Sequence, residues 1–161
     1  MIAPPTVELL RERLGASAGE VSLSHGMLVL MLPSAELIGV VSRLKSEFGF
    51  DMFLDVTAVD WAGQAPRFEV VWHFYSTSHF ARARIKTRVP EADPVVDSLT
   101  SLYGSAHFME RECHEMYGIV FHGNNDLRPI LLYEGFVGHP LRKDYPKTQE
   151  QPLVPYRTEG A

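Results

Sequence analysis

The chain has little of what cofactor binding and membrane insertion require. Only one of its 161 residues is cysteine, which excludes an internal disulfide and a self-contained iron–sulfur cluster, because such a cluster takes about four thiolate ligands. The glycine-rich phosphate-binding patterns GxGxxG and GxxxxGKS/T are both absent. The longest apolar run, residues 27–32, is far shorter than the ~20 residues that cross a bilayer. With no signal-peptide pattern at the start either, we expect any membrane contact to be made through a partner.

The composition is that of an ordinary folded domain. Hydrophobic residues make up 45% of the chain and charged residues 22%, a balance that excludes wholesale disorder. The net charge of −5 gives no overall attraction to nucleic acid or to an anionic membrane. The length suits one domain, which we expect over residues 1–146. Residues 147–161, rich in Pro, Gln, Thr and Glu, are expected to form an extended tail.

Apolar periodicity predicts helices and strands over most of the domain. Helices are predicted at residues 5–14, and from Ser34 as the N-cap to Gly49. The predicted strands are residues 21–25, 27–32, 51–60, 68–76 and 80–89. In the strand at 51–60, Met52, Leu54, Val56 and Ala58 are predicted to share one face. Another helix is predicted after Pro90, with Val95, Val96, Leu99 and Leu102 turned inward. The fold class is therefore α+β: a two-layer domain with helices on a mostly antiparallel or mixed sheet and an irregular C-terminal docking segment.

The strand at residues 80–89 has one apolar and one basic face. The basic side chains are Arg82, Arg84, Lys86 and Arg88. Such a row could face nucleic acid in a stand-alone binding module, but no RNA-binding aromatic pattern accompanies it. A solvated face, or a patch that meets an acidic protein neighbour, is the favoured interpretation.

Residues 107–146 hold four of the seven histidines and the cysteine. A helix is predicted over residues 107–117, closed by Gly118. Its predicted apolar face is Met109, Cys113, Met116 and Tyr117, and its predicted polar face is His107, Glu110, Arg111 and His114. Glu112 falls toward the apolar half, where a carboxylate needs a cation such as Arg128 or Arg142. Residues 127–133 are predicted to be extended at a sheet edge and 134–146 irregular, a combination that suits a docking surface.

Two kinds of active site compete with that interpretation. His107, Glu110 and His114 could bind zinc or iron in a metal-dependent enzyme, yet positions i and i+7 lie about 10–11 Å apart along a helix. Cys113 could be a nucleophile activated by His114, but neighbouring helical residues point about 100° apart. Neither pattern is favoured over hydrogen-bonded histidines and a buried thiol.

The same segment resembles the hallmark region of the C subunit of proton-translocating NADH–quinone oxidoreductase, the thirty-kilodalton subunit family of respiratory complex I. The resemblance rests on residues 110–119 (ERECHEMYGI), 126–132 (DLRPILL) and 138–146 (GHPLRKDYP). Many members have Trp-Asp in place of His114-Glu115, His-Pro in place of Asn124-Asn125, and Arg in place of Pro129. These departures lie at charged and turn positions.

The resemblance implies a peripheral-arm subunit that carries no cofactor. Its partners would be the quinone-site and iron–sulfur subunits, on the cytoplasmic side of a bacterial inner membrane, in a complex that uses NAD, FMN, iron–sulfur clusters and quinone. A related membrane-bound hydrogenase or ferredoxin-dependent complex stays open as the alternative. The expected structural and interface residues are Glu110, Arg111, Glu112, Arg128, Arg142, Lys143, Asp144 and Tyr145. No catalytic, cofactor-binding or metal-binding residue is expected on this chain.

Overall fold

Five strands form one mixed sheet in the computed structural model, which describes residues 4–148. The strands are β1 (Glu20–Ser24), β2 (Met27–Met31), β3 (Met52–Asp60), β4 (Phe68–Ser76) and β5 (Ala81–Val89). Their order in the sheet is β1-β2-β5-β4-β3. Every neighbouring pair is antiparallel except β2 and β5, which run parallel. The predicted two-layer α+β class, with a mostly antiparallel sheet, is confirmed.

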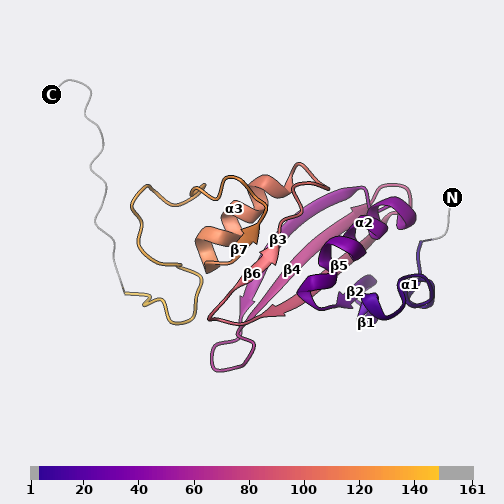
Figure 1. Ribbon diagram of the computed structural model, residues 1–161, viewed down its shortest axis with the longest axis horizontal. Helices are drawn as coiled ribbons and strands as arrows, with labels where there is room; N and C mark the ends of the chain where they lie inside the picture. The colour runs from indigo at the N-terminus through magenta and orange to yellow at the C-terminus, as the bar shows by residue number, and fades with distance from the viewer. Residues whose placement is uncertain (1–3, 149–161) are drawn as a thin grey trace, which may run out of the picture.

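Two helices lie on one face of this sheet, and a third lies along its edge (Figure 1). Helices α1 (Val7–Leu14) and α2 (Leu37–Phe48) cover the face that holds Leu30, Trp72 and Ile85. Helix α3 (Ala106–Tyr117) lies beside β3, whose outer edge would otherwise be open. The α2 stripe predicted from helical spacing is buried throughout: Leu37, Val40, Val41, Leu44 and Phe48.

Three details of the predicted elements are wrong. Ser34 does not cap α2 with its side chain, because a short 3₁₀ turn at Ser34–Glu36 precedes the helix. A bulge in β3 shifts the register between Phe53 and Asp55, so Phe53 is buried and Met52 is exposed. Beyond the bulge, Val56 and Ala58 are buried as predicted.

The third wrong detail is the helix predicted after Pro90. Strand β6 (Val95–Asp97) occupies that position and pairs in parallel with β7 (Val120–His122). Adjacent β-branched valines favour a strand, and Pro94 disfavours the helical conformation at the residue before it. The small β6–β7 sheet places Val96 and Phe121 in the main core. The β6–β7 sheet also covers one side of α3, so side chains on that side of the helix are buried.

Candidate docking segment

The chain forms no helix or strand over residues 123–148. Residues 127–146, which we call the clasp, curve around the C-terminal end of α3 (Figure 1). The predicted helix at 107–117 and its closure by Gly118 in the left-handed conformation are confirmed. The irregular backbone predicted for 134–146 is also confirmed, whereas the extended strand predicted at 127–133 is absent.

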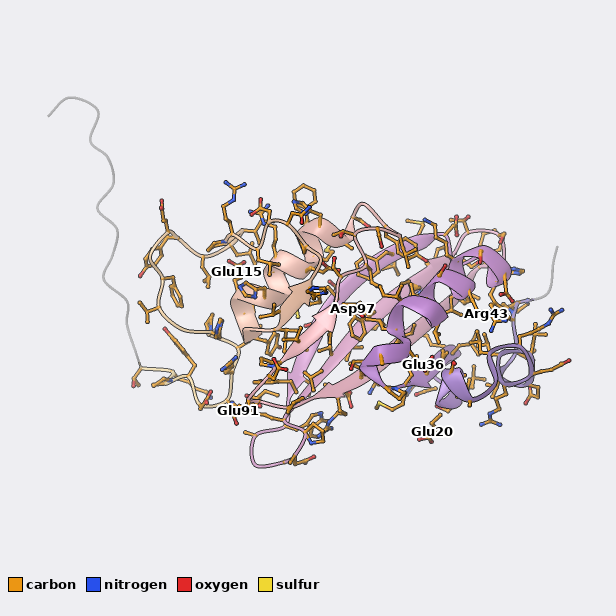
Figure 2. The ribbon with its side chains drawn as sticks, viewed as in Figure 1. Glu20, Glu36, Arg43, Glu91, Asp97 and Glu115 are labelled. Atoms are coloured by element: carbon orange, nitrogen blue, oxygen red, sulfur yellow. The ribbon has the colours of Figure 1, made fainter. Side chains whose placement is uncertain are left out.

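Glu115 replaces a strand partner for the first part of the clasp. Its buried carboxylate accepts hydrogen bonds from three successive backbone N–H groups: Ile130 at 3.0 Å, Leu131 at 2.9 Å and Leu132 at 3.2 Å. Successive amides that converge on one anion form a strong binding concavity. Figure 2 shows Glu115 between α3 and the clasp. Because these amides bind a side chain, they cannot form a strand ladder.

The last turn of α3 has a donor for each of its four terminal carbonyls. Helix C-termini leave such carbonyls without intrahelical partners, so they need donors from elsewhere. The carbonyls of His114, Glu115, Met116 and Tyr117 accept, in that order, from Gly118 N at 2.7 Å, His139 Nδ1 at 2.9 Å, Leu141 N at 3.2 Å and Arg142 Nε at 2.6 Å. Three of the donors belong to the clasp. Burial lowers the pKa of His139, which favours the neutral ring that donates from Nδ1.

Glu110 is a second buried carboxylate, and its predicted place on a polar face is wrong. It is fully buried and accepts from Ser98 Oγ at 2.7 Å, Leu99 N at 2.7 Å and Asn124 Nδ2 at 2.9 Å. Burial raises the pKa of Glu110. The β6–β7 sheet covers this side of α3, and a helical wheel contains no information about that sheet. Glu110 therefore ties α3 to the ends of β6 and β7.

Glu112 is exposed, so the prediction that it is a buried carboxylate needing a cation is wrong. Neither expected partner faces it: Arg128 pairs with Asp126 at 2.7 Å, and Arg142 donates to the end of α3. Arg111 holds the start of the clasp instead, through hydrogen bonds to the carbonyls of Arg128 at 2.9 Å and Pro129 at 3.0 Å.

An ion-pair cluster fastens the end of the clasp to the main sheet. Arg67 follows the β3–β4 loop, its side chain is 8% exposed, and its Nη2 lies 2.7 Å from Asp60 and 2.9 Å from Asp144. Its Nη1 contacts Glu91 at 2.5 Å, and the Lys143 N–H donates to Asp60 at 2.7 Å. Hydrogen bonding to Arg67 lowers the pKa of Asp60. Sequence reasoning missed Asp60 and Arg67 as partners of the clasp, because no local pattern indicates a contact 77 residues distant.

The last four predicted site residues, 142–145, take part in the contacts that hold the end of the clasp. Arg142 lies 5.0 Å from the centre of the Phe68 ring, a favourable cation–π distance. Asp144 pairs with Arg67, and Tyr145 stacks on Phe136 with ring centres 6.1 Å apart. Lys143 contributes its backbone N–H. The contacts of Arg142, Lys143 and Asp144 bring the clasp to the sheet and α3, and the Tyr145 stack lies within the clasp. An interface role for any of the eight residues stays a prediction.

The two competing active-site arrangements find little support in the geometry. Both Glu110 oxygens are engaged by donors, and His114 Nδ1 lies 2.8 Å from the Ile119 carbonyl. Within residues 4–148, no three His, Cys, Asp or Glu side chains are grouped so that they could hold a metal ion. Cys113 is buried, and burial raises its pKa well above the usual value. A thiol in that state is a poor nucleophile.

Comparison with known proteins assigns the chain to a family. The model of the family "Respiratory-chain NADH dehydrogenase, 30 Kd subunit" matches residues 30–151, most of the sheet and the whole clasp. The chain belongs to this family. A relative from Trichlorobacter lovleyi, named as the C subunit of NADH-quinone oxidoreductase, is 44% identical over 141 residues, which cover 87% of each chain. Another of the same name, from Geobacter metallireducens, is 40% identical over 138 residues, or 85% of each chain.

Two solved structures share the fold of this chain. A trypsin-resistant fragment of Nqo5 aligns with a TM-score of 0.67 and 30% identity, over 74% of this chain and 98% of the fragment. A chain of the membrane-bound sulfane sulfur reductase, an archaeal respiratory membrane complex, aligns with a TM-score of 0.78 over 88% of this chain and 84% of that chain. At 23% identity, that second likeness shows the fold alone. The chain is thus a complex I family subunit, part of an enzyme complex.

Replacement of Glu115 by Gln should destabilise this member of the thirty-kilodalton family. An amide has one acceptor oxygen, and its NH₂ group would face backbone donors of the clasp, so we expect a loss of about 1–3 kcal/mol in the free energy of unfolding. Urea denaturation measures the change. The matched control is Glu112→Gln on the exposed side of the same helix, which should change stability by less than about 0.5 kcal/mol. Equal effects from both variants would contradict the assignment of Glu115 as the anchor.

Alanine at Gly118 should cost more than alanine at Gly123. Both glycines have positive φ, +75° and +97°, so both substitutions carry backbone strain. A Cβ at position 118 would lie 2.3 Å from Arg142 Nη2 and 2.6 Å from His139 Nε2, whereas at 123 the nearest atom is 3.8 Å away. We expect Gly118→Ala to lower the melting temperature by about 2–4 °C more than Gly123→Ala, since two clasp donors must move. Similar melting temperatures of the two variants would show that the side chains of Arg142 and His139 do not limit the space at position 118.

The Asp60 contact should make stability fall in acid. The folded-state pKa of Asp60 is lowered from 3.8, so its contribution is fully present above the unfolded pKa and is lost as pH falls through the folded pKa. Asp60→Asn should therefore cost about 1–3 kcal/mol at pH 7 and progressively less below pH 4. Urea titrations from pH 7 to pH 3 measure this convergence. Asp93→Asn, in the exposed loop before β6, is the control, and a pH-independent cost of Asp60→Asn would refute the argument.

Proposed function

We propose that this chain is a structural subunit of the peripheral arm of NADH–quinone oxidoreductase, and that the clasp docks it onto the quinone-site and iron–sulfur subunits. The observation that carries the proposal is the orientation of the clasp. The backbone N–H groups of residues 130–132 and 141 are bound inward to α3, while five large apolar side chains of the clasp are exposed. That arrangement reverses the usual one for a surface loop, whose backbone faces water.

The outward side chains are large and close in sequence. Leu131 is 63% exposed, Val137 67% and Leu141 49%, with Ile130 and Tyr133 less so. Large apolar side chains gathered on one segment mark a protein interface more often than an open surface. Arg128, Lys143 and Tyr145 of the clasp, and Arg111 of α3, which binds the clasp backbone, add polar and aromatic groups to the same part of the chain. The clasp therefore has the composition of an interface with an apolar centre and a polar rim.

The proposed contribution to turnover is positional. The relatives are named as subunits of an NADH–quinone oxidoreductase, in which NAD, FMN, iron–sulfur clusters and quinone would be held by other subunits. Electron transfer among such groups depends on fixed distances, so a rigid subunit between them matters without binding any of them. Proton translocation would be a property of the whole complex. No helix within residues 4–148 is long and apolar enough to cross a membrane, and we place the subunit peripherally, on the cytoplasmic side of a bacterial inner membrane.

A related complex with another electron donor is the second candidate. The fold shared with a chain of the sulfane sulfur reductase complex favours it. The identity of 38–44% to relatives named as the C subunit of NADH-quinone oxidoreductase favours the first candidate. Co-purification with an NADH-binding subunit would separate the two, because only the first candidate includes such a subunit.

A charge placed on the clasp should prevent assembly. We expect Val137→Asp, in a tagged full-length copy, to recover at least about tenfold less of the partner subunits from solubilised membranes, since a carboxylate would be buried in an apolar contact. Mass spectrometry of the purified complex measures the recovery and identifies the partners.

The matched control is Leu23→Asp on β1, at the other end of the sheet, where the side chain is 64% exposed. It should leave recovery unchanged. If Val137→Asp assembles as well as Leu23→Asp, and both variants keep the wild-type melting temperature, the clasp is not the docking surface. If no redox subunit follows even the wild-type chain, the proposal of a complex subunit fails altogether.

A further inference from the structure

The face of the sheet turned away from α1 and α2 carries a row of basic side chains on β5. Strand alternation puts Arg82, Arg84, Lys86 and Arg88 on this face, opposite the buried Ala83 and Ile85. Figure 1 shows α1 and α2 together on the other face. Of the three α-helices in residues 4–148, α1 and α2 lie on that other face and α3 packs beside β3 (Figure 1), so none lies over the basic row. The row is central in the sheet, because β5 lies between β2 and β4.

The two halves of the row differ in how their charge is balanced. Lys86 lies 2.8 Å from Glu69, and Arg88 lies 3.7 Å from the same carboxylate. Arg88 also donates to the Pro66 carbonyl at 2.7 Å. Arg82 and Arg84, by contrast, have no ion pair or hydrogen bond to any described residue. The chain therefore leaves two guanidinium groups uncompensated side by side, although its net charge is −5.

Arg84 also has one buried donor atom without a partner among residues 4–148. Its Nε atom is buried and has no acceptor within the described part of the chain. A guanidinium N–H that is removed from water without an acceptor is unfavourable, and buried polar groups in folded proteins nearly always have a partner. An acceptor from outside the chain cannot touch this buried atom while the side chain keeps its conformation, so a partner is inferred from the unpaired charge of the two guanidinium groups.

The neighbours of the two arginines determine the chemistry of that partner. His73 lies across from Arg84, and Tyr75 across from Arg82. Burial, and next Arg84, lower the pKa of His73, so its ring is neutral near pH 7 and offers no competing charge. Asp55 lies beyond His73, on β3. On the other side, Val29 of β2 gives a half-buried apolar border next to Arg84.

We propose that this half of the open sheet face, Arg82 and Arg84 with Tyr75, His73 and Val29, docks an acidic segment of a neighbouring subunit of the complex. Residues two apart on a strand lie about 7 Å apart, so the segment should present two carboxylates at about that spacing. Each carboxylate can take two parallel N–H donors from one guanidinium, which lysine could not provide. The partner class rests on the proposed function, but the surface is separate from the clasp.

Photo-crosslinking in the assembled complex tests the proposal. Benzoylphenylalanine replaces Tyr75 in the full-length chain, and, in a second variant, Val137 of the clasp. The complex is irradiated in native membranes, and the crosslinked peptides are identified by mass spectrometry. We expect position 75 to join a peptide of another subunit with two Asp or Glu residues close in sequence. An adduct with lipid alone, with an acid-free peptide, or no adduct would overturn the proposal.

A charge reversal completes the test. Arg82→Glu with Arg84→Glu should reduce the position-75 crosslink by about tenfold or more, since two carboxylates would then repel the partner. Reversal of the partner's two carboxylates should restore it. Arg13→Glu with Arg43→Glu, on the helical side, makes the same change in net charge and should leave the crosslink unchanged. If the reversed chain unfolds, Arg82→Gln with Arg84→Gln replaces it, with a loss expected in the same direction.

The two proposals fail separately. If position 137 forms no crosslink to another subunit while position 75 does, docking through the clasp is refuted and docking through the sheet face stands. An unchanged position-75 crosslink in a folded, charge-reversed chain would refute the sheet face alone.

Discussion

The clasp depends on acceptors supplied by one helix end. A segment of twenty residues with no ladder of its own has to place its backbone donors somewhere, because buried polar groups without partners are costly. The carboxylate of Glu115 takes three of those donors, and the last carbonyls of α3 take a fourth from Leu141 N, together with the side-chain donors of His139 and Arg142. The same bonds satisfy the helix terminus. The helix end and the clasp therefore each satisfy their hydrogen-bonding groups only in the presence of the other.

Periodicity within single elements predicts which faces of α2 and β5 are buried, but it does not predict which glutamates of α3 are buried. The α2 stripe and the alternation of β5 are repeated within single elements, so the sequence alone predicts which of their faces are buried. The faces of α3 depend on β6 and β7, which pair across more than twenty residues. β6 is only three residues long, too short for a periodic signal. Glu110 and Glu112 were therefore exchanged in the prediction, with the wrong one placed inside.

The same limit applies to the ion-pair cluster at the other end of the clasp. Arg67 joins Asp60, Glu91 and Asp144, which come from three separate parts of the chain. No spacing rule connects them, and the resemblance to the thirty-kilodalton family indicated only the last of the three. The resemblance predicts a structural or interface role for the terminal residues of the clasp as a group, but what they contact could be learned only from the fold. The part of the predicted tail at 149–161 lies outside the described residues.

A clasp fixed before docking has a consequence for assembly. Association has to offset the conformational entropy that flexible loops lose when they are ordered at an interface. Here the internal contacts of Glu115, Arg142 and Arg67 order the loop within the free chain, so less of that cost remains for the moment of docking. The uncompensated arginines on the open sheet face act differently, because their charge favours encounter and orientation more than affinity. An apolar, pre-ordered surface on the clasp and a charged surface on the sheet face would together fix the chain in one orientation, which is what a purely positional role requires.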